Sequence, residues 1–165
     1  MAAGKIRYYG WSTDDTDRAR IFADGAHCTA IQQRLNIFEG EIQTLGVCEQ
    51  FNLASINRSP LGMGLLTGKF SVDTPIAADD VRSRRPSFKE NRARELEKLA
   101  MIRGILTADG RTLAQGALGW LWARSTQTIP IPGFKNITQV EENIKAADFG
   151  ALTNSQMLQI EEMLK

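Results

Sequence analysis

The sequence predicts an α/β fold in which a parallel sheet is covered by helices. Four short apolar runs lie along the 165 residues, and each is followed by a helical pattern. Strands that alternate with helices in this way are typical of a parallel sheet. Four such units form either a small open sheet or half of a closed barrel, and these patterns leave both arrangements open.

The expected strands are short apolar runs that end at turn signals or polar residues. The first run ends at Gly10 and the last ends at Pro132-Gly133, because glycine and proline interrupt regular structure. The four ranges are 6–9, 29–32, 53–56 and 128–131.

The expected helices combine apolar residues at helical spacing with polar start signals. Asp14 and Asp15 precede the first helix, where acidic side chains suit the positive end of the helix dipole. A long amphipathic pattern places Leu96, Leu99 and Ile102 on one helix face. The helix ranges are 18–23, 41–50, 87–106, 111–121 and 136–147, followed by a last helix that Thr153 caps.

Length and composition indicate one globular domain spanning residues 1–165. The chain is 42% hydrophobic and 24% charged, which suits a packed core rather than disorder. The net charge of +1 gives no single-sign field for nucleic acid or a membrane surface, and no apolar run is long enough to span a bilayer. Cys28 and Cys48 lie in apolar contexts without metal-type spacing, and the first residues contain no signal-peptide core. We therefore expect buried, reduced thiols in a cytoplasmic protein without a metal site.

A glycine-rich segment follows the third apolar run directly. It spans residues 57–70 and contains Gly62, Gly64, Gly68 and Lys69. Glycines permit positive φ and a close backbone approach to a ligand, and successive free N–H groups form an anion-binding concavity. The segment is therefore either a phosphate or pyrophosphate site at the end of a strand, or a plain turn.

Four motifs, taken in order, resemble the aldo-keto reductase family over essentially the whole chain. Residues 4–12 resemble the fifth barrel strand of that family, and Ala30-Ile31-Gln32 with Leu35-Asn36 resembles the sixth. Residues 58–69 resemble the seventh strand with its cofactor loop, and 131–143 resemble the eighth strand with its helix. The resemblance implies half of a TIM-type (β/α)8 barrel, holding strands five to eight, with NADPH bound at the C-terminal face.

The family reaction is NADPH-dependent reduction of aldehydes and ketones to alcohols. The nicotinamide supplies a hydride, and a tyrosine tuned by lysine and histidine protonates the oxygen. The resemblance places that catalytic group of Asp, Tyr, Lys and His in the other half of the barrel. Tyr8, Tyr9 and His27 lie in the wrong segments to replace it. The chain is expected to supply the cofactor-binding half, with no catalytic residue and little or no activity alone.

The resemblance assigns the nicotinamide end of the cofactor to three strand ends. Ser12, Thr13 and Gln32 stand where the family hydrogen-bonds the carboxamide, although Thr13 replaces the usual asparagine. The alternative for Ser12 or Thr13 is an N-cap of the next helix. Arg58 replaces an aromatic residue that often stacks on the nicotinamide. Its guanidinium either stacks and shifts the preferred redox direction, pairs with a phosphate, or extends into solvent.

The resemblance assigns the phosphates to the glycine-rich segment. Backbone N–H groups would face the pyrophosphate, and Lys69 would add a point charge, unless it is a solvated surface lysine. Arg82, Arg84 and Arg85 lie in the long polar loop 71–86, which either folds over the cofactor or forms a solvated cluster. The backbone groups belong to Ser59, Pro60, Leu61, Gly62 and Gly64.

The adenosine end is assigned to the start of the last-but-one helix. Gly133, Phe134 and Lys135 open that helix, and Lys135 suits the adenosine 2′-phosphate, which favours NADP over NAD. The next polar residues share one helix face and would hold the adenine and ribose, unless that face is simply solvated. They are Gln139, Glu142 and Asn143.

The expected partners of the chain follow from its half-barrel form, and two functions other than cofactor binding stay open. Half a barrel leaves two open strand edges and an apolar face, so we expect self-association or pairing with a complementary N-terminal half. The small-molecule partner of the completed protein is a carbonyl substrate, with no nucleic acid or membrane partner. The alternatives are a non-catalytic nucleotide-binding or interaction module, and a truncated remnant.

Overall fold

Four parallel strands form one sheet in the computed structural model, which describes residue 1 and residues 3–165. The strands are ordered β1-β2-β3-β4, so each pairs with its neighbour in the sequence. This confirms the predicted α/β class, and the sheet is part of a (β/α)8 barrel. The strands are β1 (Tyr9–Ser12), β2 (Cys28–Arg34), β3 (Ala54–Arg58) and β4 (Thr128–Pro130).

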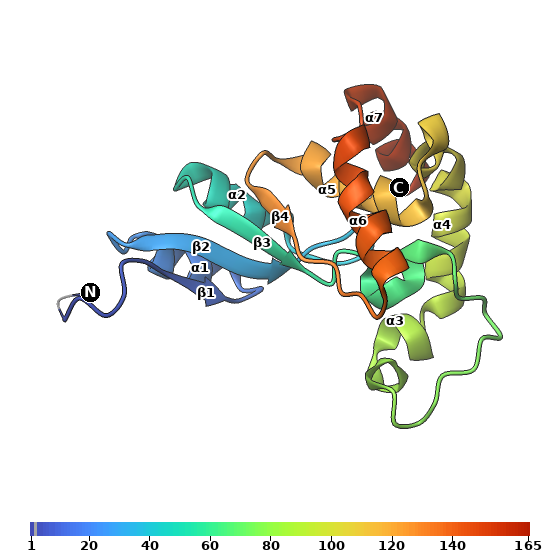
Figure 1. The fold of residues 1–165 in the computed structure, drawn as a ribbon, viewed down its shortest axis with the longest axis horizontal. Helices are drawn as coiled ribbons and strands as arrows, with labels where there is room; N and C mark the ends of the chain where they lie inside the picture. The colour runs from blue at the N-terminus through green and yellow to red at the C-terminus, as the bar shows by residue number, and fades with distance from the viewer. Residues whose placement is uncertain (2) are drawn as a thin grey trace.

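Helices follow each strand, and most of them gather at one end of the molecule. Figure 1 shows α1 and α2 beside the sheet and α4 to α7 grouped on the opposite side of the view. Side-chain caps begin many of the helices, and α5 and α7 carry complete capping boxes. The helices are α1 (Thr16–Ala23), α2 (Ile42–Gln50), α3 (Pro86–Lys89), α4 (Arg92–Leu106), α5 (Leu113–Arg124), α6 (Ile137–Phe149) and α7 (Asn154–Met163), with 3₁₀ turns η1 (Gly62–Thr67), η2 (Val81–Arg84) and η3 (Ala108–Gly110).

The first strand is displaced from its predicted range of 6–9. Strand β1 begins at Tyr9, the first residue that pairs with β2, opposite Cys28. Ile6 and Tyr8 lie outside the sheet and are 53% and 63% exposed. The apolar run was therefore a misleading signal, because sheet pairing rather than hydrophobicity decides where this strand begins.

The single helix predicted over 87–106 is also wrong. Helix α3 ends at Lys89 and α4 begins at Arg92, and Asn91 between them has φ −104° and ψ 1°. The carbonyl of Pro86 accepts from the N–H groups of both Glu90 and Asn91, which closes α3. Phe88 in α3 is buried edge-on against Phe70, with 5.2 Å between ring centroids. This contact directs α3 toward the long loop instead of continuing α4.

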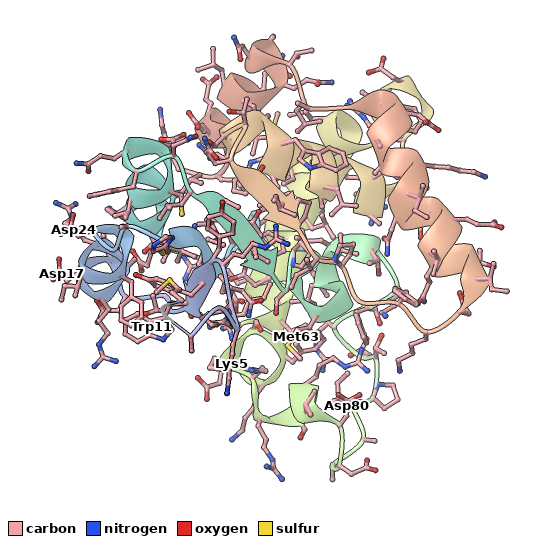
Figure 2. All side chains as sticks on the ribbon, turned by 60° about the vertical axis from the view of Figure 1, so that its left-hand side comes forward. Lys5, Trp11, Asp17, Asp24, Met63 and Asp80 are labelled. Atoms are coloured by element: carbon pink, nitrogen blue, oxygen red, sulfur yellow. The ribbon has the colours of Figure 1, made fainter. Side chains whose placement is uncertain are left out.

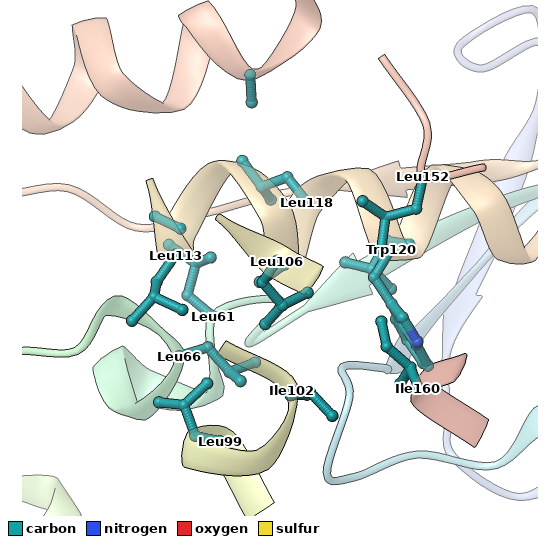
Figure 3. Close-up of a cluster of buried hydrophobic side chains, with 14 of the residues drawn as sticks. Leu61, Leu66, Leu99, Ile102, Leu106, Leu113, Leu118, Trp120, Leu152 and Ile160 are labelled. Carbon is teal, nitrogen blue, oxygen red and sulfur yellow. The ribbon is translucent and has the colours of Figure 1, made fainter. Parts of the chain in front are cut away.

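Two apolar clusters hold the fold together. The larger joins α4, α5 and α7 to the turn after β3, with Leu66, Ile102, Leu106 and Leu118 at its centre (Figure 3). The smaller lies between the sheet and helices α1 and α2. Cys28 and Cys48 are both free and buried, as predicted, and they belong to the smaller cluster. These clusters fix the carboxyl ends of the strands relative to α6.

Among the described residues, α1 and α2 pack on one face of the sheet and no helix covers the other face. The register places Gly10, Ala30 and Ala54 in one row, and Gln32 with Ile56 in the next. A Cβ on Gly10 would lie 2.6 Å from the Ala30 carbonyl oxygen, so even an alanine there would push the strands apart. Within the described residues, no helix is long and apolar enough to cross a membrane.

Candidate functional site

A cleft of about 710 Å³ lies at the carboxyl ends of β3 and β4. The turn after β3, the long loop and the start of α6 form its walls. Met63 and Asp80, both labelled in Figure 2, belong to the first two of these walls. Ligand sites of parallel sheets form at this edge, where loops diverge from the strand ends. The cleft is lined by Ser59, Pro60, Leu61, Met63, Gly64, Thr67, Lys69, Asp80, Val81, Arg82, Ala114, Ile131, Gly133, Phe134, Lys135, Gln139, Glu142 and Asn143.

The turn after β3 has a strained, left-handed backbone. Ser59 and Met63 have φ of 55° and 54°, a conformation that non-glycine residues rarely adopt. Gly64 has φ 103°, and a Cβ there would lie 2.6 Å from Lys69 Cε. A glycine at this position therefore lets the lysine lie across the turn. Strain of this kind gathers where the backbone serves a site.

The amides of this turn are divided between internal bonds and the cleft. Gly62 N–H donates to the Ser59 carbonyl at 3.0 Å, and Gly64 N–H donates to the Leu61 carbonyl at 2.8 Å. Within the described chain, the N–H groups of Leu61 and Met63 have no hydrogen-bond acceptor. Gly62 itself is buried beneath the cleft wall instead of lining the cleft. The amides without an acceptor thus alternate with the glycine amides, which bond within the turn.

Three cations and two carboxylates, Asp80 and Glu142, line the cleft. Arg82 holds Asp80 with Nε–Oδ1 at 2.8 Å and Nη2–Oδ2 at 2.6 Å, and these hydrogen bonds lower the pKa of Asp80 to about 2. Burial lowers the pKa of Lys69, and repulsion from Arg82 and Lys135 lowers it further. Neither lysine forms an ion pair with any described residue. The excess positive charge favours an anionic ligand.

Aromatic contacts place the long loop beside the cleft. The Arg82 guanidinium lies over the ring of Phe70 at 5.2 Å and near that of Phe88 at 6.0 Å. Arg82 lines the cleft, whereas Arg84 and Arg85 are exposed and lie outside it. Arg84 and Arg85 therefore fit the solvated alternative, and a contact of Arg82 with a cofactor stays a prediction.

The start of α6 forms the remaining wall. Asn136 caps the helix by accepting from Gln139 N–H at 3.0 Å, and Gln139 Oε1 accepts from Lys135 N–H at 2.7 Å. The Glu142 carbonyl accepts from Gln115 Nε2 at 3.1 Å, which fixes α6 to α5. These bonds hold the polar face of α6 toward the cleft, and Phe134 extends beside it with 63% exposure.

Ser12 and Gln32 lie together in a second, smaller hollow of about 260 Å³ on the open face of the sheet. Gln32 Nε2 donates to Ser12 Oγ at 3.2 Å. Thr13 N–H donates to the Gln32 carbonyl at 2.9 Å. Asp15, not Ser12 or Thr13, caps α1, so the capping alternative for those two residues is wrong. The pair of polar side chains presents both donor and acceptor groups to this hollow.

Arg58 lies outside both cavities and pairs with Asp14 of the loop after β1. From the sequence, Asp14 was expected only to favour the start of the first helix, and several residues of the cleft wall had no expected role. Asp80 was detectable only as an acid two residues before Arg82, and the others carried no signal of their own. The unassigned wall residues are Met63, Thr67, Asp80, Val81 and Ala114.

Among the described residues, no group of three or more His, Cys, Asp or Glu side chains is placed to hold a metal ion.

The fold and the cleft define a class: a partial parallel β/α barrel with an anion-attracting cleft at its strand ends. The model of the aldo/keto reductase family matches residues 1–165. The chain belongs to the aldo/keto reductase family, whose members are oxidoreductases.

Individual relatives agree with this assignment. The aldo-keto reductase yakc of Schizosaccharomyces pombe is 36% identical over 158 residues, which are 92% of this chain and 45% of that protein. The chloroplastic pyridoxal reductase of Arabidopsis thaliana is 30% identical over 134 residues, covering 79% of this chain and 34% of that protein. The solved glycerol dehydrogenase AKR11B4 of Gluconobacter oxydans is 29% identical, with a TM-score of 0.86. It covers 99% of this chain, which in turn covers 50% of that structure. The chain thus spans about half the length of these two reductases or less.

Proposed function

We propose that this chain binds NADP(H) in the cleft at the ends of β3 and β4. The observation that carries the proposal is the convergence of Lys69, Arg82 and Lys135 on that cleft, where the two carboxylates Asp80 and Glu142 leave an excess of one positive charge. A dinucleotide brings a pyrophosphate and, in NADP(H), an additional 2′-phosphate. The name of the related yakc protein includes NADP(+), which agrees with this assignment.

The residues of the cleft fit such a ligand. Its volume of about 710 Å³ lies in the usual range of cofactor pockets. The free amides of Leu61 and Met63 and the charge of Lys69 suit a pyrophosphate. Lys135 at the start of α6 suits the 2′-phosphate, because helix N-termini and lysines both attract phosphate. Gln139, Glu142 and Asn143 are placed to hydrogen-bond the adenosine.

The reaction proposed for the complete protein is reduction of a carbonyl substrate to an alcohol. When bound, the nicotinamide supplies the hydride. This chain's residues bind and orient the cofactor, with Ser12 and Gln32 placed to hydrogen-bond the carboxamide. None of the residues assigned to the cleft is proposed as a proton donor. We therefore expect little or no carbonyl reduction by the chain alone.

Further βα units are proposed to cover the open face of the sheet. Parallel sheets are normally buried on both faces, whereas Ile129 in β4 is 49% exposed. Barrel interiors are filled by bulky side chains, but Gly10, Ala30 and Ala54 form a row of small ones. A complementary half with large interior side chains would fill that row better than a second copy. In the absence of such a half, self-association would cover the face.

Substitution of the cleft cations tests the cofactor assignment. Lys135→Gln is expected to weaken NADPH binding by about tenfold, because a charge-assisted phosphate contact is lost. Lys145→Gln, in the middle of α6 and outside the cleft lining, is the matched control. Isothermal titration calorimetry measures both, and equal NADPH affinity in the two variants would contradict the proposed site.

A further inference from the structure

We propose that Arg58, held in place by Asp14, makes the site prefer the reduced, uncharged nicotinamide over the oxidised, positively charged one. The inference rests on the proposed function, because it concerns the nicotinamide end of the bound dinucleotide. Asp14 is a positioning residue in this account, and Arg58 sets the specificity.

The position of Arg58 links the two cavities. Ile56 lines the smaller hollow and Ser59 lines the cleft, so Arg58 lies between them along the chain. Alternate residues of a strand point to the same face, which places Arg58 on the face of Ile56. The register pairs Ile56 with Gln32, so Arg58 lies one step closer to the carboxyl edge than the Gln32 side chain. A dinucleotide that extends from the cleft toward Gln32 therefore passes Arg58.

Asp14 is fixed by contacts with three other elements. Its Oδ2 accepts from Arg58 Nη2 of β3, and its Oδ1 accepts from the Arg34 N–H of β2 at 2.6 Å. Its carbonyl accepts from the Thr44 hydroxyl of α2 at 3.4 Å. The carboxylate therefore has a defined position, and it holds the guanidinium at the strand ends.

The charges around this pair are otherwise balanced. Arg34 pairs with Glu39 at 3.6 Å, and Asp15 pairs with Arg18 at 3.5 Å. Within the described chain, Asp14 is the carboxylate that pairs with Arg58. The pair is half-buried, with side-chain exposures of 31% for Arg58 and 43% for Asp14. Charge interactions in such a setting are weaker than in a dry interior but stronger than in bulk water.

The two redox forms of the cofactor differ by one charge on the nicotinamide ring. A neighbouring guanidinium repels the oxidised ring and leaves the reduced ring unaffected, while the carboxylate offsets part of that repulsion. All other contacts, including both phosphate sites, are common to the two forms. The ratio of the dissociation constants for NADP⁺ and NADPH therefore isolates the effect of Arg58.

The test measures that ratio by isothermal titration calorimetry in the full chain. The wild type is expected to bind NADPH more tightly than NADP⁺. Arg58→Gln removes the charge and is expected to lower the ratio by about tenfold. Asp14→Asn keeps a side-chain oxygen that can accept from Arg58 but removes the negative charge, so the guanidinium stays in place uncompensated and the ratio is expected to rise about threefold. Asp17→Asn changes the net charge equally on the exposed face of α1 and serves as the control.

Because the two variants are expected to change the ratio in opposite directions, the test distinguishes this role from a purely structural one. If the pair only stabilised the loop, loss of either partner would weaken both redox forms alike and leave the ratio unchanged. An unchanged ratio in Arg58→Gln, or a ratio that Asp14→Asn lowers, would overturn the inference while leaving the cofactor site intact. Failure of the wild type to bind either form would instead overturn the proposed function.

Discussion

Gly64 and Lys69 show how one backbone position controls a charge in the cleft. The turn places Lys69 Cε where a Cβ on Gly64 would lie, so the lysine crosses the turn only because that Cβ is missing. Burial and two neighbouring cations then lower the pKa of Lys69, and among the described residues it forms no ion pair. A bound anion would offset the repulsion between Lys69 and the neighbouring cations.

Gly64→Ala is therefore expected to affect both stability and binding. The left-handed φ of 103° and the contact with Lys69 predict a loss of about 1–2 kcal/mol in the free energy of unfolding. The displaced lysine should also weaken NADPH binding. Gly104→Ala is the control, because Gly104 lies inside α4 with no atom within 4 Å of the added Cβ. That change should increase stability by up to about 1 kcal/mol and leave binding unchanged, as urea denaturation and calorimetry would report.

Cys48 provides a test of burial through pH. Burial raises its pKa from the ordinary cysteine value of 9.0 to about 11. The folded state therefore favours the neutral thiol, and that stabilisation is fully present below the unfolded pKa and is lost as pH rises toward 11. Urea denaturation between pH 8 and pH 11 should show the wild type losing more stability than Cys48→Ala. Parallel pH profiles for the two proteins would contradict the burial of this thiol.

The elements that build the cleft are positioned by caps as well as by the core. Asn136 caps α6 at the cleft, and Thr153 caps α7 far from it through the same type of bond. Asn136→Ala and Thr153→Ala should each cost about 1 kcal/mol of stability. Only Asn136→Ala should also weaken NADPH binding, since it loosens the turn that carries Lys135. Equal binding losses in both variants would show that general stability, not the α6 cap, controls the site.

The elements that the sequence predicts well are those with strong local signals. The turn after β3 and the start of α6 combine glycines, prolines and caps within a few residues, and both lie in the cleft. The first strand and the helix over 87–106 were wrong because tertiary contacts decided them. Pairing with Cys28 sets the start of β1, and the packing of Phe88 on Phe70 separates α3 from α4.

The same distinction applies to the candidate site. Lys69 and Lys135 belong to motifs, so the resemblance identified them. Asp14 acts through Arg58, which lies 44 residues further along the chain, and no local pattern connects the two. Such partners become visible only when parallel strands bring their carboxyl ends together.

In the part of the chain that the structure describes, one sheet face and the outer edges of β1 and β4 are uncovered, and this predicts association of the purified chain. Ile129→Lys is expected to reduce that association, because a charge would be buried on the open face. Leu158→Lys is the control, since Leu158 is 66% exposed and belongs to α7, which lies away from the sheet (Figure 1). Light scattering over a range of concentrations measures the effect. A monodisperse wild-type monomer at every concentration would contradict the prediction.

Binding of NADPH, with NADH as the comparison, tests the central proposal most directly. The account predicts saturable binding of NADPH by the purified chain and weaker binding of NADH, because only NADPH carries the 2′-phosphate that Lys135 would contact. Calorimetry on the wild-type chain supplies both affinities. No binding of NADPH, or equal affinity for the two nucleotides, would contradict the assignment of this cleft to NADP(H).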